Sequence, residues 1–202
     1  MRAAARPAIL ISGFYGFGNV GDEAVLAGMV QSLRARLGSV PVIVLSADPG
    51  ATAAAYAVEA VDRTDLPAII MAMRRSRLFL SGGGSLLQDV TSARSAVYYL
   101  GLLRLAQIMG LRTMVYAAGL GPLRRPVLRS LTRRVLDRTD AVTVRDADSA
   151  ALVGALGTRR GPSLTADPAV LLSPAEDSRV ESLLRSGGAD APIIGVVVRP
   201  WG

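Results

Sequence analysis

Short runs of aliphatic and β-branched residues alternate with longer stretches in which Leu, Ala and Arg recur at helical spacing, and this alternation constrains the fold most. It is typical of βαβ units, which build a parallel sheet. The predicted strands are Ala8–Ser12, Val42–Ser46, Leu78–Ser81, Thr113–Ala117, Ala141–Val144, Ser163–Ala166 and Ile193–Val198. The predicted helices are Glu23–Leu37, Leu66–Arg74, Ala93–Met109, Pro126–Asp137 and Ser149–Leu156. We therefore expect an α/β fold with a doubly wound, Rossmann-like parallel sheet, whose strand-to-helix loops share the carboxyl edge.

The composition changes near the end of the chain. From Ser173 to Ala191, Ser, Pro, Gly and acidic residues surround one short predicted helix, Arg179–Arg185, which indicates an interdomain connection. The apolar run Ile193–Val198 follows it. We expect a Rossmann-like domain over residues 1–172, a linker over residues 173–192, and the first strand of a second domain over residues 193–202.

The residue types exclude several kinds of chemistry. The chain has no Cys and no His, and its 23 basic residues are all Arg. Thiol chemistry, structural zinc, imidazole catalysis and a lysine Schiff base are therefore impossible for these residues. We expect no metal and no cofactor. The lack of Cys fits a reducing compartment, and we expect a cytoplasmic protein because no apolar stretch reaches the ~18 residues of a membrane span.

The net charge of +7 attracts nucleic acid, anionic membranes and anionic substrates alike. Aromatic residues make up only 4% of the chain and do not alternate with Arg, so we expect no nucleic-acid partner. Six arginines form a basic helical patch, which is either a solvated face or a surface that attracts an anionic bilayer or a lipid-diphosphate substrate. These are Arg124, Arg125, Arg129, Arg133, Arg134 and Arg138.

A first glycine-rich loop lies between the first strand and the first helix. Its predicted ligand-binding glycines are Gly16, Gly18 and Gly21, because they let the backbone approach a ligand at a helix N-terminus. Their spacing matches a dinucleotide fingerprint, but the acidic residues at the helix start would repel a pyrophosphate. Asn19 and Asp22 either cap the helix or position the ligand, and the sequence favours neither.

The second glycine-rich loop follows the third predicted strand. Three successive glycines cost conformational entropy that an ordinary turn does not require, so this loop is the strongest indication of a binding site. The polar residues after the glycines are suited to add hydrogen bonds. The predicted binding residues here are Gly82, Gly83, Gly84, Ser85, Gln88 and Asp89.

Two further loops complete the predicted site. Gly119 lies in a third glycine-rich turn, after the fourth predicted strand. Arg145 directly follows the fifth predicted strand, and its guanidinium suits a carboxylate or a phosphate. The alternative for Arg145 is a salt bridge to Asp146 or Asp148. Asp167 belongs to a turn for which a structural role is favoured.

In order, five motifs resemble the polysaccharide pyruvyl transferase family, close to its CsaB type. They are Gly16–Ala24, Ser81–Asp89, Ala118–Pro122, Val144–Asp146 and Ala166–Pro168. The resemblance implies the N-terminal half of a two-domain fold similar to GT-B glycosyltransferases, with the active site between the halves. It also implies transfer of the enolpyruvyl unit of phosphoenolpyruvate to a sugar as a pyruvate ketal. In the CsaB type the sugar is N-acetylmannosamine in a lipid-linked cell-wall polymer precursor, which serves S-layer anchoring.

The resemblance assigns a catalytic role to Arg145 and continues through Val198–Trp201, where Arg199 is a further predicted binding residue. It places a His and a Lys in the second domain, so we expect the present chain alone to be catalytically silent. The expected partners are phosphoenolpyruvate, a lipid-linked saccharide, the C-terminal domain and the inner face of the membrane. The alternatives are a nucleotide-sugar glycosyltransferase and a non-catalytic domain that binds saccharide or lipid diphosphate; a dehydrogenase is disfavoured.

Overall fold

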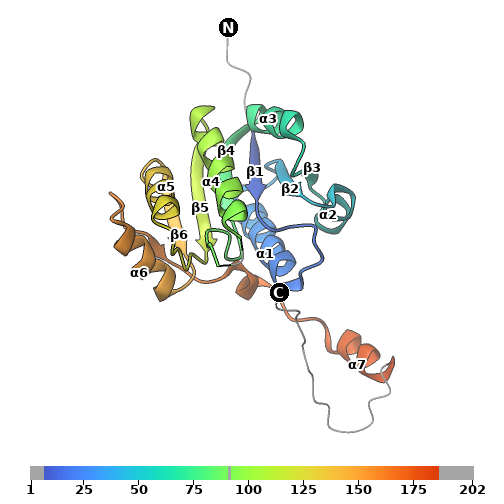
Figure 1. The fold of residues 1–202 in the computed structure, drawn as a ribbon. Coiled ribbons are helices and arrows are strands. Elements are labelled where there is room, and N and C mark those ends of the chain that lie inside the picture. Colours follow the sequence, from blue (N-terminus) through green and yellow to red (C-terminus); the bar gives the residue numbers. More distant parts are fainter. Residues whose placement is uncertain (1–6, 91, 187–202) are drawn as a thin grey trace. The chain divides into compact units, whose positions relative to one another are not determined.

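The computed structural model describes residues 7–90 and 92–186. Within these residues one sheet of seven strands has the order β3-β2-β1-β4-β5-β6-β7, with every neighbouring pair parallel (Figure 1). The strands are β1 (Ala8–Ser12), β2 (Val42–Ser46), β3 (Glu59–Asp62), β4 (Ser76–Gly82), β5 (Arg112–Ala118), β6 (Ala141–Val144) and β7 (Ser163–Leu164). This order confirms the predicted doubly wound, Rossmann-like α/β fold.

Helices connect the strands, as the alternating pattern predicts. They are α1 (Val20–Leu37), α2 (Pro49–Tyr56), α3 (Leu66–Arg75), α4 (Ala93–Ile108), α5 (Pro126–Leu136), α6 (Ala147–Leu156), the 3₁₀ helix η1 (Pro168–Leu171) and α7 (Asp177–Ser186). The strand expected at Ile193–Val198 and the binding residue Arg199 lie outside the described residues.

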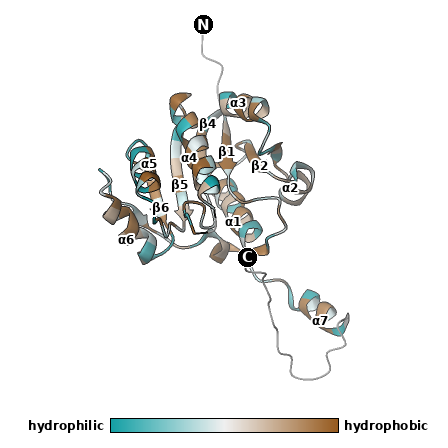
Figure 2. Ribbon diagram, in the orientation of Figure 1, coloured by the Kyte–Doolittle hydropathy of each residue, from teal (hydrophilic) through white to brown (hydrophobic). Residues whose placement is uncertain are grey.

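The sheet has an apolar layer on each face because successive side chains of a strand point to opposite sides. In β1, Ile9 and Ile11 pack with Leu26 and Met29 of α1. Leu10, between them, belongs to the core on the other face, which buries residues of α3, α4, α5 and α6. Figure 2 colours the central strands β1 and β2 as hydrophobic, as expected for strands that are covered on both faces.

The predicted elements omit α2 and β3. The α2 sequence is rich in Ala and buries only Thr52, so it lacks a clear apolar stripe, and β3 is a four-residue edge strand with exposed ends. Local signals nevertheless fix α2, because the Asp48 carboxylate accepts a hydrogen bond from the Ala51 amide and Pro49 occupies the first turn. The predicted Ser163–Ala166 strand is shorter in the structure and exposed.

The chain divides into two compact units, Met1–Leu172 and Ser173–Gly202. The first unit contains the sheet, and η1 closes it by packing on α1, where a Cβ added to Gly28 would lie 2.1 Å from the Pro168 carbonyl oxygen. The described part of the second unit contains the amphipathic helix α7. None of the described helices is long and apolar enough to cross a bilayer.

Candidate functional site

The loops that carry the predicted site residues leave the sheet at its carboxyl edge. Because all neighbouring strands are parallel, the loops after β1, β4, β5, β6 and β7 emerge on the same side. The order in which successive strands are added reverses at β1, because β2 and β3 lie on one side of it and β4 lies on the other, so the loops after β1 and β4 lead to opposite sides. Open α/β sheets bind ligands at such a switch point.

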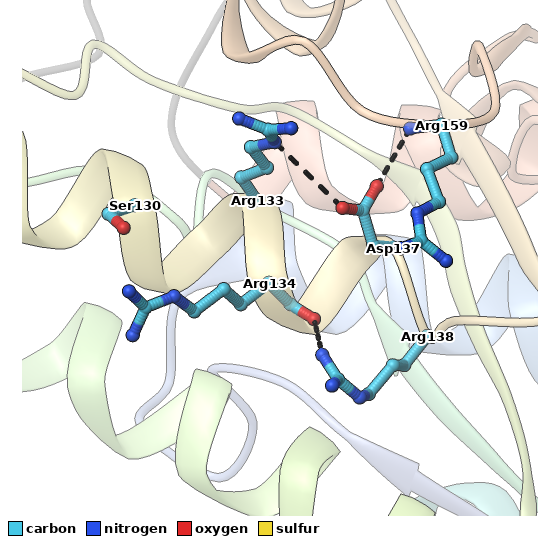
Figure 3. A pocket seen from close by; sticks show the side chains of 6 residues that line it. All are labelled: Ser130, Arg133, Arg134, Asp137, Arg138 and Arg159. Atoms are coloured by element: carbon cyan, nitrogen blue, oxygen red, sulfur yellow. Dashed lines mark hydrogen bonds and ion pairs between the residues drawn. The ribbon is translucent and has the colours of Figure 1, made fainter.

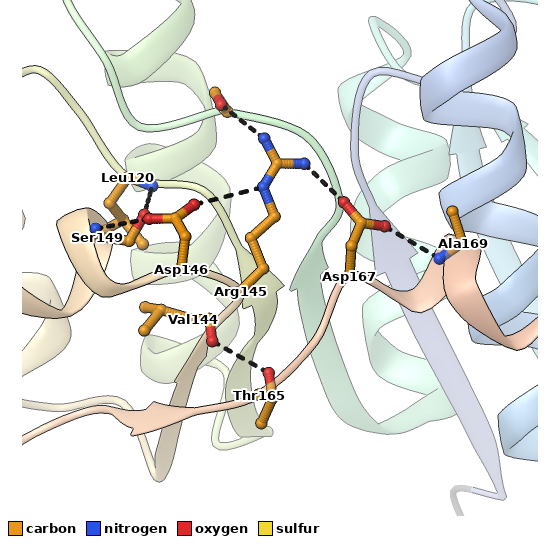
Figure 4. Close-up of polar contacts among 9 residues, drawn as sticks. Leu120, Val144, Arg145, Asp146, Ser149, Thr165, Asp167 and Ala169 are labelled. Atoms are coloured by element: carbon orange, nitrogen blue, oxygen red, sulfur yellow. Dashed lines mark hydrogen bonds and ion pairs between the residues drawn. The ribbon is translucent and has the colours of Figure 1, made fainter.

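Arg145 follows β6 and lies among three of these loops (Figure 4). Its Nη1 forms an ion pair with the Asp167 carboxylate at 2.7 Å, and its Nη2 donates to the Ser85 hydroxyl at 3.3 Å. Its Nε lies 3.6 Å from an Asp146 carboxylate oxygen. The side chain keeps 30% of its surface exposed, so the guanidinium is held in place but still reaches solvent.

The acidic residues around Arg145 also organise the backbone. Asp146 caps α6 by accepting a hydrogen bond from the Ser149 amide at 2.7 Å, and hydrogen bonds from Ser149 lower the pKa of the Asp146 carboxyl. Asp167 accepts a hydrogen bond from the Ala169 amide at the start of η1. The predicted alternative pairing of Arg145 is thus present for Asp146, while no ion pair joins Arg145 to Asp148 within the described residues. The pairing with Asp167 has no local sequence signal, because 22 positions separate the two residues.

The triple glycine at the end of β4 has a packing role at its first two positions. Gly82 and Gly83 are buried, and a Cβ would lie 2.6 Å from Met29 at the first position and 2.6 Å from Val25 at the second. Gly83 also has a φ of +77°, which L side chains rarely adopt. These two glycines therefore let α1 approach the end of β4. The polypeptide reaches the surface only at Gly84, which is half-buried.

Ser85, after β4, and Gly119, after β5, bring their two loops into contact. A Cβ at Gly119 would lie 2.8 Å from the Ser85 hydroxyl and 3.0 Å from Arg145 Nη2. The Gly119 amide also donates to the Gly84 carbonyl at 3.1 Å. The absence of a side chain at position 119 therefore allows Ser85 and Arg145 to meet.

Asp89 joins the second and third glycine-rich loops. Its two carboxylate oxygens accept hydrogen bonds from the backbone amides of Arg124 and Arg125 at 2.7–2.9 Å. These hydrogen bonds lower the pKa of the Asp89 carboxyl. Gln88 accepts from the Val90 amide at 2.8 Å. In the structure, both side chains thus stabilise the loop from which the predicted ligand contacts would come.

The first glycine-rich loop takes no part in the hydrogen bonds that Asp89 accepts. Gly16 packs against β2, where a Cβ would lie 2.1 Å from the Ser46 hydroxyl, and its amide donates to Glu23 at 2.8 Å. Asn19 caps α1 by accepting from the Gly21 amide. Gly18 is exposed, with open space around the position of a Cβ.

Asp22 faces the second loop from the first turn of α1. A Cβ at Gly84 would lie 2.5 Å from the Asp22 carboxylate. The structure therefore brings Asp22, Gly84, Ser85, Gly119 and Arg145 to one place on the carboxyl edge. It leaves Gly16, Gly18 and Asn19 in the neighbouring loop, Gly21 in the first turn of α1, and Gln88 and Asp89 in supporting positions.

Buried tyrosines support these loops, and the sequence reasoning did not identify them. The Tyr15 hydroxyl donates to the Gly82 carbonyl at 2.7 Å, and the Tyr99 hydroxyl donates to the Gly13 carbonyl at 3.2 Å. Burial raises the pKa of Tyr15 well above its ordinary value and raises that of Tyr99 to about 12. Both phenols are therefore neutral donors at physiological pH, and they fix the ends of β1 and β4.

Arg63 lies among aromatic rings beside the first glycine-rich loop. Its guanidinium carbon lies 5.1 Å from the ring centre of Phe17, 4.7 Å from that of Tyr98 and 5.7 Å from that of Tyr99. Phe17 also stacks on Phe14 with a ring-centre distance of 4.0 Å, and 46% of its surface is exposed. The cluster presents a cation and an aromatic face next to the switch point.

A comparison with protein families matches residues 19–200 to the model described as Polysaccharide pyruvyl transferase. The matched region begins at the cap of α1 and includes the triple glycine, Gly119 and Arg145. No curated protein matches the chain at a significant level.

Proposed function

The chain belongs to the polysaccharide pyruvyl transferase family, a family of transferases, and from this membership we propose that it binds phosphoenolpyruvate for transfer of the enolpyruvyl unit to a sugar. The geometry that supports the proposal is the position of Arg145, held between the glycine-rich loops at the carboxyl edge. The chemistry of phosphoenolpyruvate fits this position, because it carries a carboxylate and a phosphate, both of which suit a guanidinium.

Arg145 has donors left for such an anion. A guanidinium carries five N–H groups, of which two belong to each terminal nitrogen. The contacts to Asp167 and Ser85 use one N–H of each terminal nitrogen, so one remains on each. The carboxylates of Asp167 and Asp146 more than neutralise the guanidinium charge in the free protein, and they fix its orientation before the ligand binds. We propose that the donor anion binds these remaining N–H groups and the amides near Gly84.

The transfer reaction sets the requirements for the rest of the site. The methylene carbon of the donor gains a proton to become a methyl group, the phosphate leaves the adjacent carbon, and two hydroxyl oxygens of the sugar bond to that carbon. These steps need proton transfer to carbon and from the hydroxyl groups. Glu23, Asp89, Asp146 and Asp167 all hold backbone amides. We therefore assign binding and orientation, and not proton transfer, to these residues.

For the acceptor, we propose the CsaB-type substrate, an N-acetylmannosamine unit in a lipid-linked cell-wall polysaccharide precursor, with S-layer anchoring as its biological role. The five sequence motifs support this assignment. Phe17 stacks on Phe14 and lies beside Arg63, and its exposed part offers an apolar surface that a sugar ring can contact.

The proposal predicts that replacing Arg145 weakens donor binding. In a calorimetric titration, Arg145→Gln should raise the Kd for phosphoenolpyruvate about tenfold or more, because charge-assisted hydrogen bonds are lost. Arg112→Gln is the matched control, since Arg112 is an exposed arginine at the opposite edge of the sheet and pairs with Asp140. The control should bind as the parent chain does.

The same titration tests the alternative functions. A nucleotide-sugar glycosyltransferase would bind a nucleotide sugar more tightly than phosphoenolpyruvate. That result, or equal affinities for phosphoenolpyruvate in the Arg145 and Arg112 variants, would contradict the proposal.

A further inference from the structure

A pocket of about 430 Å³ lies away from the carboxyl edge, where α5 and α6 end (Figure 3). Its lining residues are Ser130, Arg133, Arg134, Asp137, Arg138 and Arg159. The chain enters β6 and β7 directly after these helix ends, so the pocket belongs to the amino edge of the sheet. The pocket lining begins at Ser130 in the middle of α5 and continues to Arg138 beyond the helix end, whereas Arg145 lies in a loop at the carboxyl edge.

The pocket has an excess of positive charge. Four guanidinium groups line it together with one carboxylate, that of Asp137. This carboxylate lies 3.8 Å from Arg133 Nε and accepts a hydrogen bond from the Arg159 backbone amide at 2.7 Å. Within the described residues, neither the Arg134 nor the Arg159 guanidinium forms an ion pair, and Arg138 donates to the Arg134 carbonyl.

A solvated helix end explains only part of this arrangement. Arginines in the last turn of α5 interact favourably with the helix dipole, which accounts for Arg133 and Arg134. Arg159 lies beyond the end of α6, and its amide is tied to Asp137 so that its side chain lines the same hollow. Two separate segments therefore contribute cations to one concave surface.

We infer that this pocket binds a phosphate group, carried either by a soluble diphosphate or by the headgroup of an anionic lipid. Guanidinium groups suit the oxygens of a phosphate, and the Ser130 hydroxyl adds a neutral donor to the lining. The inference does not depend on the proposed transfer reaction, because none of its residues belongs to the carboxyl edge.

The first experiment uses inorganic pyrophosphate as the probe. Titrations are made in an Arg145→Gln background, which removes the contribution of the carboxyl edge. Arg134→Gln with Arg159→Gln should raise the Kd about tenfold, since two charged donors are lost. The matched control is Arg74→Gln with Arg77→Gln, a pair of exposed arginines near the same edge of the sheet but outside the pocket. This control should leave the Kd within about twofold of the starting value.

The second experiment separates the two sources of phosphate. Co-sedimentation is measured with vesicles of phosphatidylglycerol mixed into phosphatidylcholine. Loss of vesicle binding in the pocket variant, but not in the control variant, identifies a lipid headgroup; a pocket-specific effect on pyrophosphate alone identifies a soluble ligand. Equal effects of the two variants, or no binding of either probe, would overturn the inference, because the pocket would then contribute nothing beyond net charge. Thermal unfolding checks that both variants are folded.

Discussion

At the scale of single residues, the carboxyl edge depends on small side chains and buried hydroxyl groups. Gly119 is small enough for Ser85 and Arg145 to meet, and Gly83 allows α1 to approach β4. Tyr15 is fully buried and ties the Gly82 carbonyl to the core. The position of the predicted ligand contacts therefore rests on residues that need not touch the ligand.

We predict that Tyr15→Phe lowers the free energy of unfolding by about 1–2 kcal/mol, because the buried Gly82 carbonyl loses its hydroxyl donor. Urea denaturation measures the change. Tyr116→Phe is the control, since no hydrogen bond of the half-buried Tyr116 hydroxyl is found among the described residues, and it should change stability by less than about 0.5 kcal/mol. Equal losses in the two variants would contradict the assigned role of Tyr15.

At the scale of elements, the loops after β4 and β5 act as one unit. The Gly119 amide donates to Gly84, the Gly121 amide donates to Leu87, and the Asp89 amide donates to Pro122. The Asp89 carboxylate adds its hydrogen bonds to the amides before α5. The two glycine-rich loops, which the sequence presents as separate motifs, are therefore coupled.

This coupling predicts a pH dependence. The pKa of Asp89 in the folded protein is below its ordinary value, so its contribution to stability is complete above that value, about 3.9, and is lost as the pH falls through the folded pKa. Asp89→Asn should therefore destabilise the chain at pH 7, and the difference from the parent should shrink in acid.

Thermal unfolding between about pH 7 and pH 3 measures this difference. Asp148→Asn serves as the control, because Asp148 is exposed and no hydrogen bond or ion pair of its side chain is found within the described residues. A difference between the Asp89 variant and the parent that stays constant with pH would exclude a role for the ionised carboxylate.

At the scale of the molecule, the parallel sheet separates two chemically distinct edges. The carboxyl edge carries Arg145 among carboxylates and loop amides, and the amino edge carries the arginine pocket. The first compact unit extends to Leu172 because η1 packs against α1 and Asp167 pairs with Arg145.

We predict that a chain ending at Leu172 keeps the thermal stability of the sheet, whereas a chain ending at Leu164 does not. The shorter chain loses η1, which buries Pro168 against α1, together with the Arg145–Asp167 ion pair. A loss of about 2 kcal/mol lowers the midpoint by roughly 4–8 °C. Calorimetry measures both midpoints, and identical values for the two chains would show that η1 does not stabilise the unit.

The parallel α/β fold, the glycine-rich loops and the family could be predicted from the sequence, because the alternation of strands and helices and the order of the motifs are local patterns. Element ends were less accurate, and α2 and β3 were missed because neither has a strong apolar period.

The contacts of each site residue could not be predicted from the sequence and became visible only in the folded chain. The fold divided the triple glycine into two buried packing positions and a half-buried turn residue, and it paired Arg145 with Asp167 and Ser85. It also joined Arg159 to the arginines of α5. These contacts link residues far apart in the chain, and their distances depend on how helices pack on the sheet, which no local pattern encodes.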